Sequence, residues 1–168
     1  VHYHSDSTQA AAEETMQAVK DLGTDAFSIQ LDLTDAANNE ALFKAAKDKF
    51  GRVDVAVNTA GMVLKKPFAE TSEDEFDTMS AINSKAAYFF IKEAGKVLEN
   101  DGKIISIATS LLGAYTGLYS TYAGGKAPVE HYTRAASKEF GERGISVTTI
   151  APGPMDTPFF YGQESEDA

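Results

Sequence analysis

The chain has 168 residues and is acidic, with 15 basic and 25 acidic side chains and a net charge of −10. This charge disfavours nucleic-acid and anionic-membrane partners, because both require a positively charged surface. The lack of cysteine excludes disulfides and thiolate catalysis and fits a reducing compartment. No apolar run reaches membrane-spanning length, and the first six residues lack the pattern of a signal peptide. We therefore expect a soluble, cytoplasmic protein with one domain over residues 1–168.

Strand-like and helix-like segments alternate along the chain. Ser7 is typical of a helix N-cap, Gly23 and Gly51 are typical of helix ends, and Ser72 and Glu75 have capping-box spacing. Continuously apolar strands that alternate with helices predict an α/β fold, a doubly wound parallel sheet with helices on both faces. The expected strands cover residues 1–4, 26–31, 53–57, 103–108 and 145–150, and the expected helices begin at Ser7 and Thr34 and cover 72–100 and 119–142.

A tyrosine and a lysine, Tyr122 and Lys126, stand four residues apart and so share one face of a helix. The pKa of a phenol, about 10, must fall by about three for acid/base work at neutral pH, which takes about 4 kcal/mol. One ammonium about 4 Å away in a partly wet site supplies about 4 kcal/mol. Tyr88 and Lys92 have the same spacing, but no strand-end hydroxyl precedes them, and we interpret them as core plus a solvated lysine.

Chemically distinctive residues follow three of the expected strands. Asn58-Thr59-Ala60-Gly61 follows the third, Thr109-Ser110 with Gly113 follows the fourth, and 152–157 (Pro-Gly-Pro-Met-Asp-Thr) follows the last. The carboxyl ends of parallel strands are where open α/β sheets bind ligands. Packing alone does not explain three such strand ends in this order.

With these motifs and Asn83, the chain resembles the short-chain dehydrogenase/reductase family over essentially its whole length, with a Rossmann-like three-layer sheet. The resemblance implies that Tyr122 exchanges a proton with the substrate oxygen, that Ser110 hydrogen-bonds this oxygen, and that Lys126 holds the nicotinamide ribose and lowers the pKa of Tyr122. Asn83 would hold a water of the proton relay, and Asp32 would contact the adenine. The expected catalytic residues are Asn83, Ser110, Tyr122 and Lys126, and the expected cofactor-binding residues are His4, Ser5, Asp32, Leu33, Asn58, Ala60, Gly61, Tyr122, Lys126, Pro152, Gly153 and Thr157.

The chain departs from the family pattern in two places. The family's commonest interval before Tyr122 selects Thr109, whereas the Ser-x-x-Gly pattern selects Ser110; we favour Ser110, because the loop after Gly113 absorbs a deletion more easily than the strand end does. The family's opening strand with its glycine-rich turn is not found, nor is its last strand. In the strand order 3-2-1-4-5-6 the first of these would lie between the strands at 1–4 and 53–57. We therefore expect an incomplete record of a longer protein, in which this part alone is neither stable nor able to bind the cofactor.

Several of these residues also have a purely structural interpretation. Asp32 and Thr34 could only cap a helix, and Asn83 could be a buried polar spacer. Two glycines and a proline within one helix, at 124, 125 and 128, are costly, so we expect close approach of the cofactor or of a partner helix, or else a kink at Pro128. His2 and His4 alternate like metal ligands, but no third ligand has suitable spacing, and we expect no metal.

The leading hypothesis is an NAD(P)-dependent oxidoreductase that interconverts a secondary alcohol and a ketone; the alternative is a catalytically silent dinucleotide-sensing or scaffold protein. His4 and Ser5 after the first strand can donate hydrogen bonds to a 2′-phosphate, so NADP is favoured over NAD, although Asp6 is close enough to oppose it.

We also expect a homo-dimer or tetramer through the two long helices, with Phe89, Phe90, Tyr132 and Phe140 facing outward. A partly apolar substrate is indicated by Leu111, Leu112, Tyr115, Leu118, Met155, Phe159 and Phe160.

Overall fold

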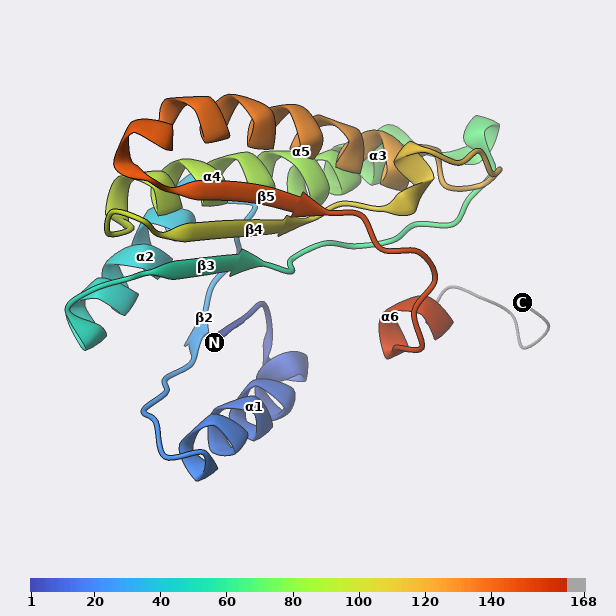
Figure 1. The fold of residues 1–168 in the computed structure, drawn as a ribbon. Helices are drawn as coiled ribbons and strands as arrows, with labels where there is room; N and C mark the ends of the chain where they lie inside the picture. The colour runs from blue at the N-terminus through green and yellow to red at the C-terminus, as the bar shows by residue number, and fades with distance from the viewer. Residues whose placement is uncertain (163–168) are drawn as a thin grey trace.

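The computed structural model describes residues 1–162 and shows helices alternating with parallel strands (Figure 1). The strands form two sheets, one with the order β1-β2 and one with the order β3-β4-β5. The last six residues of the expected domain lie outside the described part. The strands are β1 (His2–Tyr3), β2 (Ile29–Gln30), β3 (Val55–Asn58), β4 (Lys103–Ile107) and β5 (Ser146–Ile150), and the helices are α1 (Gln9–Asp21), α2 (Ala36–Phe50), α3 (Glu73–Ser80), α4 (Ala86–Val97), α5 (Ser120–Glu139) and α6 (Pro158–Tyr161).

The hydrophobic core lies between the three-stranded sheet and the helices α2, α4 and α5. Alternate residues of each strand face these helices, as Ala56 of β3, Ile104 of β4 and Val147 of β5 do. The strands are in parallel register, so their carboxyl ends meet at one edge of the sheet. The buried cluster consists of Phe43, Ala56, Phe90, Ile91, Ala94, Leu98, Ile104, Ala136, Ile145 and Val147.

The helices expected to begin at Ser7 and Thr34 begin two residues later, at Gln9 and Ala36. Ser7 is not an N-cap: Ser5 caps a 3₁₀ turn over Asp6–Thr8, in which the Thr8 amide donates to the Ser5 carbonyl at 2.9 Å, and Thr8 caps α1. Similarly, Asp35 rather than Thr34 caps α2, since the Asp35 carboxylate accepts from the Ala37 amide at 2.9 Å. The expected capping box of Ser72 and Glu75 is confirmed.

The single helix expected over 72–100 is interrupted by a π turn over Ala81–Lys85. Such a turn adds one residue, which rotates the following helix by about 100° relative to an unbroken α-helical phase. Phe90 faces the core, where its ring lies 5.0 Å from that of Phe43, and Phe140 packs against the same cluster. The prediction that Phe90 and Phe140 face outward is therefore wrong. Tyr88, expected in the core, is instead half exposed.

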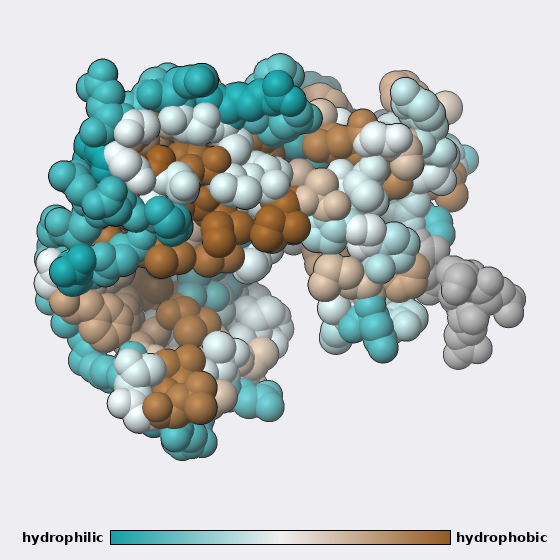
Figure 2. Space-filling model, in the orientation of Figure 1, coloured by the Kyte–Doolittle hydropathy of each residue, from teal (hydrophilic) through white to brown (hydrophobic). Residues whose placement is uncertain are grey.

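The α/β class and the parallel strands are confirmed, but helices cover only one face of β3-β4-β5 within residues 1–162. Val55, Val57 and Ile150 on the other face are 55%, 50% and 48% exposed. Figure 2 shows hydrophobic atoms at the surface in the region of these strands. The reason is that α1 packs on β1, in the separate two-stranded sheet. Among the described helices, none has the length and apolar character needed to cross a membrane.

Candidate active site

The polar residues expected at the strand ends do meet at the carboxyl edge of β3-β4-β5. Asn58 at the end of β3 is buried, and its side-chain oxygen accepts from the Ala60 amide at 3.0 Å, which fixes the turn that follows. The Ser110 amide donates to the Pro152 carbonyl at 2.9 Å, which joins the end of β4 to the Pro-Gly loop after β5. A backbone bond thus joins the loops after β4 and β5, and the loop after β3 lies at the same edge because β3 pairs with β4.

Helix α5 brings Lys126 into the centre of this edge. The side chain is buried, and its Nζ donates to the Ile107 carbonyl at 2.8 Å. Burial lowers the pKa of Lys126 to about 8, because an ammonium removed from water is less stable than the neutral amine. A Cβ atom at Gly61 would lie only 2.9 Å from this Nζ and 3.1 Å from the Asn83 side-chain oxygen. Gly61 therefore leaves room that any other residue would fill.

Tyr122 lies one helical turn before Lys126 and is also buried. Burial raises the pKa of Tyr122 above its usual value of 10, and a hydrogen bond with the Thr109 side chain acts in the opposite direction. At neutral pH the phenol is therefore protonated and can donate a proton. The family resemblance assigns the lowering of the Tyr122 pKa to Lys126. In this structure the Thr109 hydroxyl has that effect, and the Lys126 ammonium donates to the Ile107 carbonyl instead.

The two candidate hydroxyls at the end of β4 face different surroundings. Thr109 keeps the extended backbone of the strand and its side chain is buried toward Tyr122, whereas Ser110 opens a short 3₁₀ turn. The Ser110 hydroxyl faces the Pro-Gly loop, since a Cβ atom at Gly153 would lie 3.9 Å from it. The geometry thus connects Thr109 with Tyr122, while the role of Ser110 as the catalytic hydroxyl stays a prediction.

Two substitutions separate these hydroxyls. If Thr109 orients Tyr122, Thr109→Val should lower kcat/KM by at least tenfold, as expected when a polar contact to a reacting group is lost. Ser110→Ala should cause the larger loss if Ser110 holds the substrate oxygen, as the Ser-x-x-Gly pattern predicts. Steady-state rates of both variants, with melting temperatures as a folding control, decide between the two alignments.

Asn83 is fully buried in the π turn and holds a loop that is distant in sequence. Its side-chain nitrogen donates to the Met62 carbonyl at 2.9 Å, and its side-chain oxygen accepts from the Met62 amide at 3.1 Å. Asn83 is therefore a positioning residue for the loop after β3, in addition to any part in a proton relay. The sequence did not indicate the Met62 contact, because it joins residues 21 positions apart.

One of the two adjacent glycines of α5, Gly125, is explained by close packing. A Cβ atom at Gly125 would lie 3.2 Å from the Asn83 Cβ and 3.3 Å from the Met79 carbonyl, so close approach of a neighbouring helix explains this glycine. Gly124, in contrast, faces open space. The helix continues through Pro128 to Glu139.

The residues expected around the adenosine lie at the ends of β1 and β2. The His4 Nδ1 lies 4.0 Å from an Asp32 carboxylate oxygen, and Asp32 accepts from the amide and the hydroxyl of Thr34. These bonds hold the pKa of Asp32 below its usual value. The purely structural interpretation, in which Asp32 caps the helix, is wrong, because Asp35 is the N-cap of α2. Asp32 instead stabilises the turn before the helix. Leu33 is buried and its carbonyl accepts from Asn39 at 2.9 Å, while Thr157 precedes α6 as its N-cap.

Asp6, which we considered as an obstacle to a 2′-phosphate, is engaged elsewhere: it accepts from the Gln30 side chain at 3.0 Å. The Ser5 hydroxyl lies 2.8 Å from that of Ser7. Within residues 1–162, no three His, Asp or Glu side chains gather as metal ligands would.

Known proteins are similar to this chain in sequence and in fold. The family model described as enoyl-(acyl carrier protein) reductase matches residues 2–168. Trihydroxynaphthalene reductase of Colletotrichum orbiculare is 33% identical over 151 residues, which cover 89% of this chain and 53% of that protein. Short chain dehydrogenase mdpC of Emericella nidulans is 30% identical over 156 residues, which cover 92% of this chain and 59% of that protein.

Among solved structures, a putative dehydrogenase from Burkholderia cenocepacia with bound NADP is 61% identical, with a TM-score of 0.97, covering 100% of this chain and 63% of that one. A blue fluorescent protein from a metagenomic library, in complex with NADPH, is 31% identical with a TM-score of 0.87, covering 94% of this chain and 64% of that one. The chain thus spans between about half and two thirds of the length of these relatives. On the match over residues 2–168, the chain belongs to the short-chain dehydrogenase/reductase family.

Proposed function

We propose that the protein is an NADP-dependent oxidoreductase that interconverts a secondary alcohol and a ketone. The observation that carries this proposal is the pair of buried groups on α5, the Tyr122 phenol beside Thr109 and the Lys126 ammonium at the strand ends. In the reduction, Tyr122 donates its proton to the substrate oxygen, which Ser110 or Thr109 holds by a hydrogen bond. Asn83, expected as a catalytic residue from the resemblance, would act by holding the Met62 loop in place.

The residues at the strand ends fit a dinucleotide. The space left by Gly61 beside the Lys126 Nζ is a cradle that a Cβ atom would fill. Lys126 would hold the nicotinamide ribose. The cofactor would also be bound by residues after β3 and β5: Asn58, Ala60, Gly61, Pro152, Gly153 and Thr157. Residues after β1 and β2 would hold the adenosine end: His4, Ser5, Asp32 and Leu33. When bound, NADP supplies or accepts the hydride. A relative that is 61% identical carries NADP, which supports this assignment.

Cofactor preference tests this proposal. His4 and Ser5 can donate hydrogen bonds to a 2′-phosphate, and the Asp6 carboxylate is held by Gln30. We expect kcat/KM with NADPH to exceed that with NADH by about tenfold to a few hundredfold, the scale of one charged contact. Measured on the intact protein, equal values or a preference for NADH would overturn the choice of NADP and indicate Asp6 as a ribose ligand.

A catalytically silent dinucleotide-binding or scaffold protein is the second candidate. It would bind NADPH but show no NADPH oxidation with any ketone, and Tyr122→Phe would leave its binding constant unchanged. A buried lysine beside a buried tyrosine is costly, and a protein that only binds has no need of the tyrosine. This arrangement favours the enzyme.

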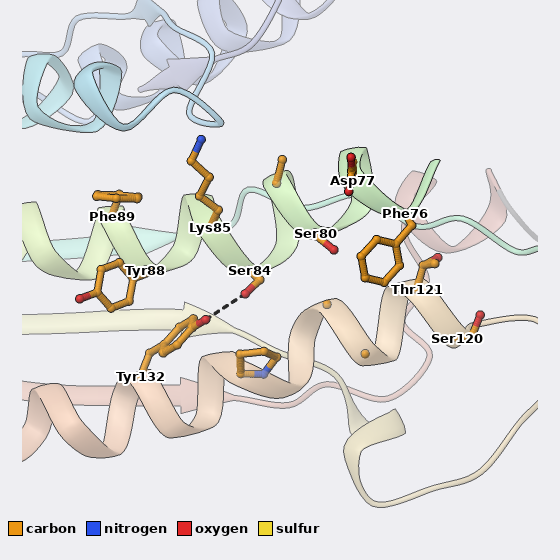
Figure 3. A pocket seen from close by; sticks show the side chains of 14 residues that line it. Phe76, Asp77, Ser80, Ser84, Lys85, Tyr88, Phe89, Ser120, Thr121 and Tyr132 are labelled. Atoms are coloured by element: carbon orange, nitrogen blue, oxygen red, sulfur yellow. Dashed lines mark hydrogen bonds between the residues drawn. The ribbon is translucent and has the colours of Figure 1, made fainter. Parts of the chain in front are cut away.

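We also propose a homo-oligomer, formed through the surface between α3, α4 and α5. A groove of about 720 Å³ runs there, lined by Phe76, Tyr88, Phe89 and Tyr132 among others, and Figure 3 shows the Tyr132 hydroxyl bonded to that of Ser84 at 3.1 Å. Phe76 and Tyr88 are about half exposed, more aromatic surface than a monomer usually leaves in water.

The oligomer has a direct test. Light scattering of the intact protein at micromolar concentration should give a multiple of the monomer mass. Tyr88→Glu would place a charge in the groove and should reduce that mass to the monomer's. A monomeric mass for the unmodified protein would contradict the proposal.

A further inference from the structure

Two aromatic rings from separate segments flank the ring of Tyr122. The Tyr119 ring, just before α5, lies 6.3 Å from it at an interplanar angle of 60°, and the Phe159 ring on α6 lies 6.4 Å from it at 53°. Both distances fall within the range that favourable aromatic pairs adopt. The Tyr122 ring thus contacts two other aromatic rings, from residues that are 40 positions apart.

The Tyr119 ring also lines a hollow of about 300 Å³ next to α5, whereas Tyr122 and Phe159 are not among the lining residues. Phe68, Leu111, Tyr115, Leu118, Tyr119 and Ala123 are among its lining residues. Phe68 is 83% exposed and Tyr115 is fully exposed, which is unusual for large apolar side chains that gather at one place. The hollow is therefore suited to an apolar group, and Tyr119 is the residue that connects it with the Tyr122 ring.

The backbone that carries Tyr119 is held in an uncommon conformation. Leu118 has a φ of +72°, which non-glycine residues rarely adopt. Its carbonyl accepts from the Lys66 amide at 2.8 Å, and the Lys66 ammonium is bound by both oxygens of Glu75 at 2.7 and 2.9 Å. The Lys65 ammonium lies 5.7 Å from the centre of the Tyr119 ring. These contacts hold Tyr119 in place before a substrate arrives, because strained backbone persists only where its surroundings fix it.

From this geometry we infer that Tyr119 and Phe159 determine specificity, and that the substrate carbonyl is bonded directly to an aromatic ring. The inference rests on the proposed function. The substrate oxygen must come within about 2.7 Å of the Tyr122 hydroxyl to receive its proton. A ring on the carbonyl carbon then lies beside the Tyr119 and Phe159 rings. The carbonyl carbon takes a hydride from NADPH and the oxygen takes the Tyr122 proton, which gives a benzylic secondary alcohol and NADP⁺.

The test compares acetophenone with cyclohexyl methyl ketone, which has the same carbon skeleton without the aromatic ring. The ratio of their kcat/KM values is measured for the intact protein with NADPH and for Phe159→Leu and Tyr119→Leu, which keep apolar bulk but lose the ring. Comparing ratios between variants cancels the intrinsic reactivity of the two ketones. We expect each substitution to lower the ratio by about two- to tenfold, mainly through the KM of acetophenone.

Tyr161→Leu is the matched control, because Tyr161 lies on the same helix, is 60% exposed and pairs with Phe160 instead. Its ratio should equal that of the unmodified protein. An unchanged ratio in both Phe159→Leu and Tyr119→Leu, with turnover that depends on Tyr122, would overturn the inference and leave the proposed function standing. If the unmodified protein reduces neither ketone nor any other carbonyl, the proposed function fails and the inference fails with it. Calorimetric binding of acetophenone to Tyr122→Phe, with and without Phe159→Leu, reports the ring contact independently of turnover.

Discussion

Tyr122→Phe is expected to lower kcat/KM for carbonyl reduction by at least 10²-fold. The substitution removes the proton donor and keeps the ring, so the contacts with Tyr119 and Phe159 persist. General acid/base catalysis by one positioned group contributes about 10²–10⁴-fold, and this is the part that is lost. Because burial raises the pKa of Tyr122, the phenol carries its proton throughout the neutral range, and its titration should not change the rate of reduction there.

The matched control is Tyr132→Phe, which removes a hydroxyl from the same helix at a distance from the strand ends. Its rate should stay within about twofold of the unmodified protein. NADPH oxidation followed by absorbance, together with a thermal melt, separates loss of chemistry from loss of fold. A folded Tyr122→Phe protein with near-normal rates would remove Tyr122 from the mechanism.

Local signals in the sequence predicted the elements that local chemistry determines. The capping box of Ser72 and Glu75 and the left-handed glycine after α2, Gly51, depend on residues within one turn of each other. The carboxyl ends of three parallel strands could likewise be paired from their order alone. These features place Asn58, Thr109 and the Pro-Gly loop at one edge without knowledge of any long-range contact.

The features that the sequence did not predict depend on contacts between distant residues. The π turn over 81–85 contains Asn83, whose side chain bonds to Met62 in another loop, and no local pattern signals the added residue. Phe90 packs against Phe43 of α2, which is 47 positions away in the sequence. Whether Thr109 or Ser110 faces Tyr122 depends on where the extended backbone of β4 ends, which counting from Tyr122 does not determine. The contact of Phe159 with Tyr122 joins α6 to α5 and is equally non-local.

Lys126→Met is expected to lower kcat/KM by at least 10²-fold while leaving the folded state as stable as before at pH 7, or more stable. Lys126 is 4% exposed, and its ammonium donates a hydrogen bond to the Ile107 carbonyl. The fall of its pKa from 10.5 to about 8 corresponds to roughly 3 kcal/mol of unfavourable burial of the charged form. Methionine has a similar length and carries no charge, so the substitution removes this energetic cost. It also removes the ammonium that would hold the cofactor ribose and favour proton transfer by Tyr122, which lowers kcat/KM.

The pH dependence of stability separates this account from a purely structural role of Lys126. Below about pH 8 both the folded and the unfolded protein hold the Lys126 proton, so the full penalty is present. Between about pH 8 and 10.5 the folded protein loses the proton first, and its free energy of unfolding rises relative to that of Lys126→Met, which lacks this titration. Denaturant unfolding of both proteins at pH 7, 9 and 10 gives the difference directly. If Lys126→Met is less stable than the unmodified protein at pH 7, by a margin that does not grow with pH, Lys126 stabilises the fold. An unchanged kcat/KM in Lys126→Met would exclude Lys126 from catalysis.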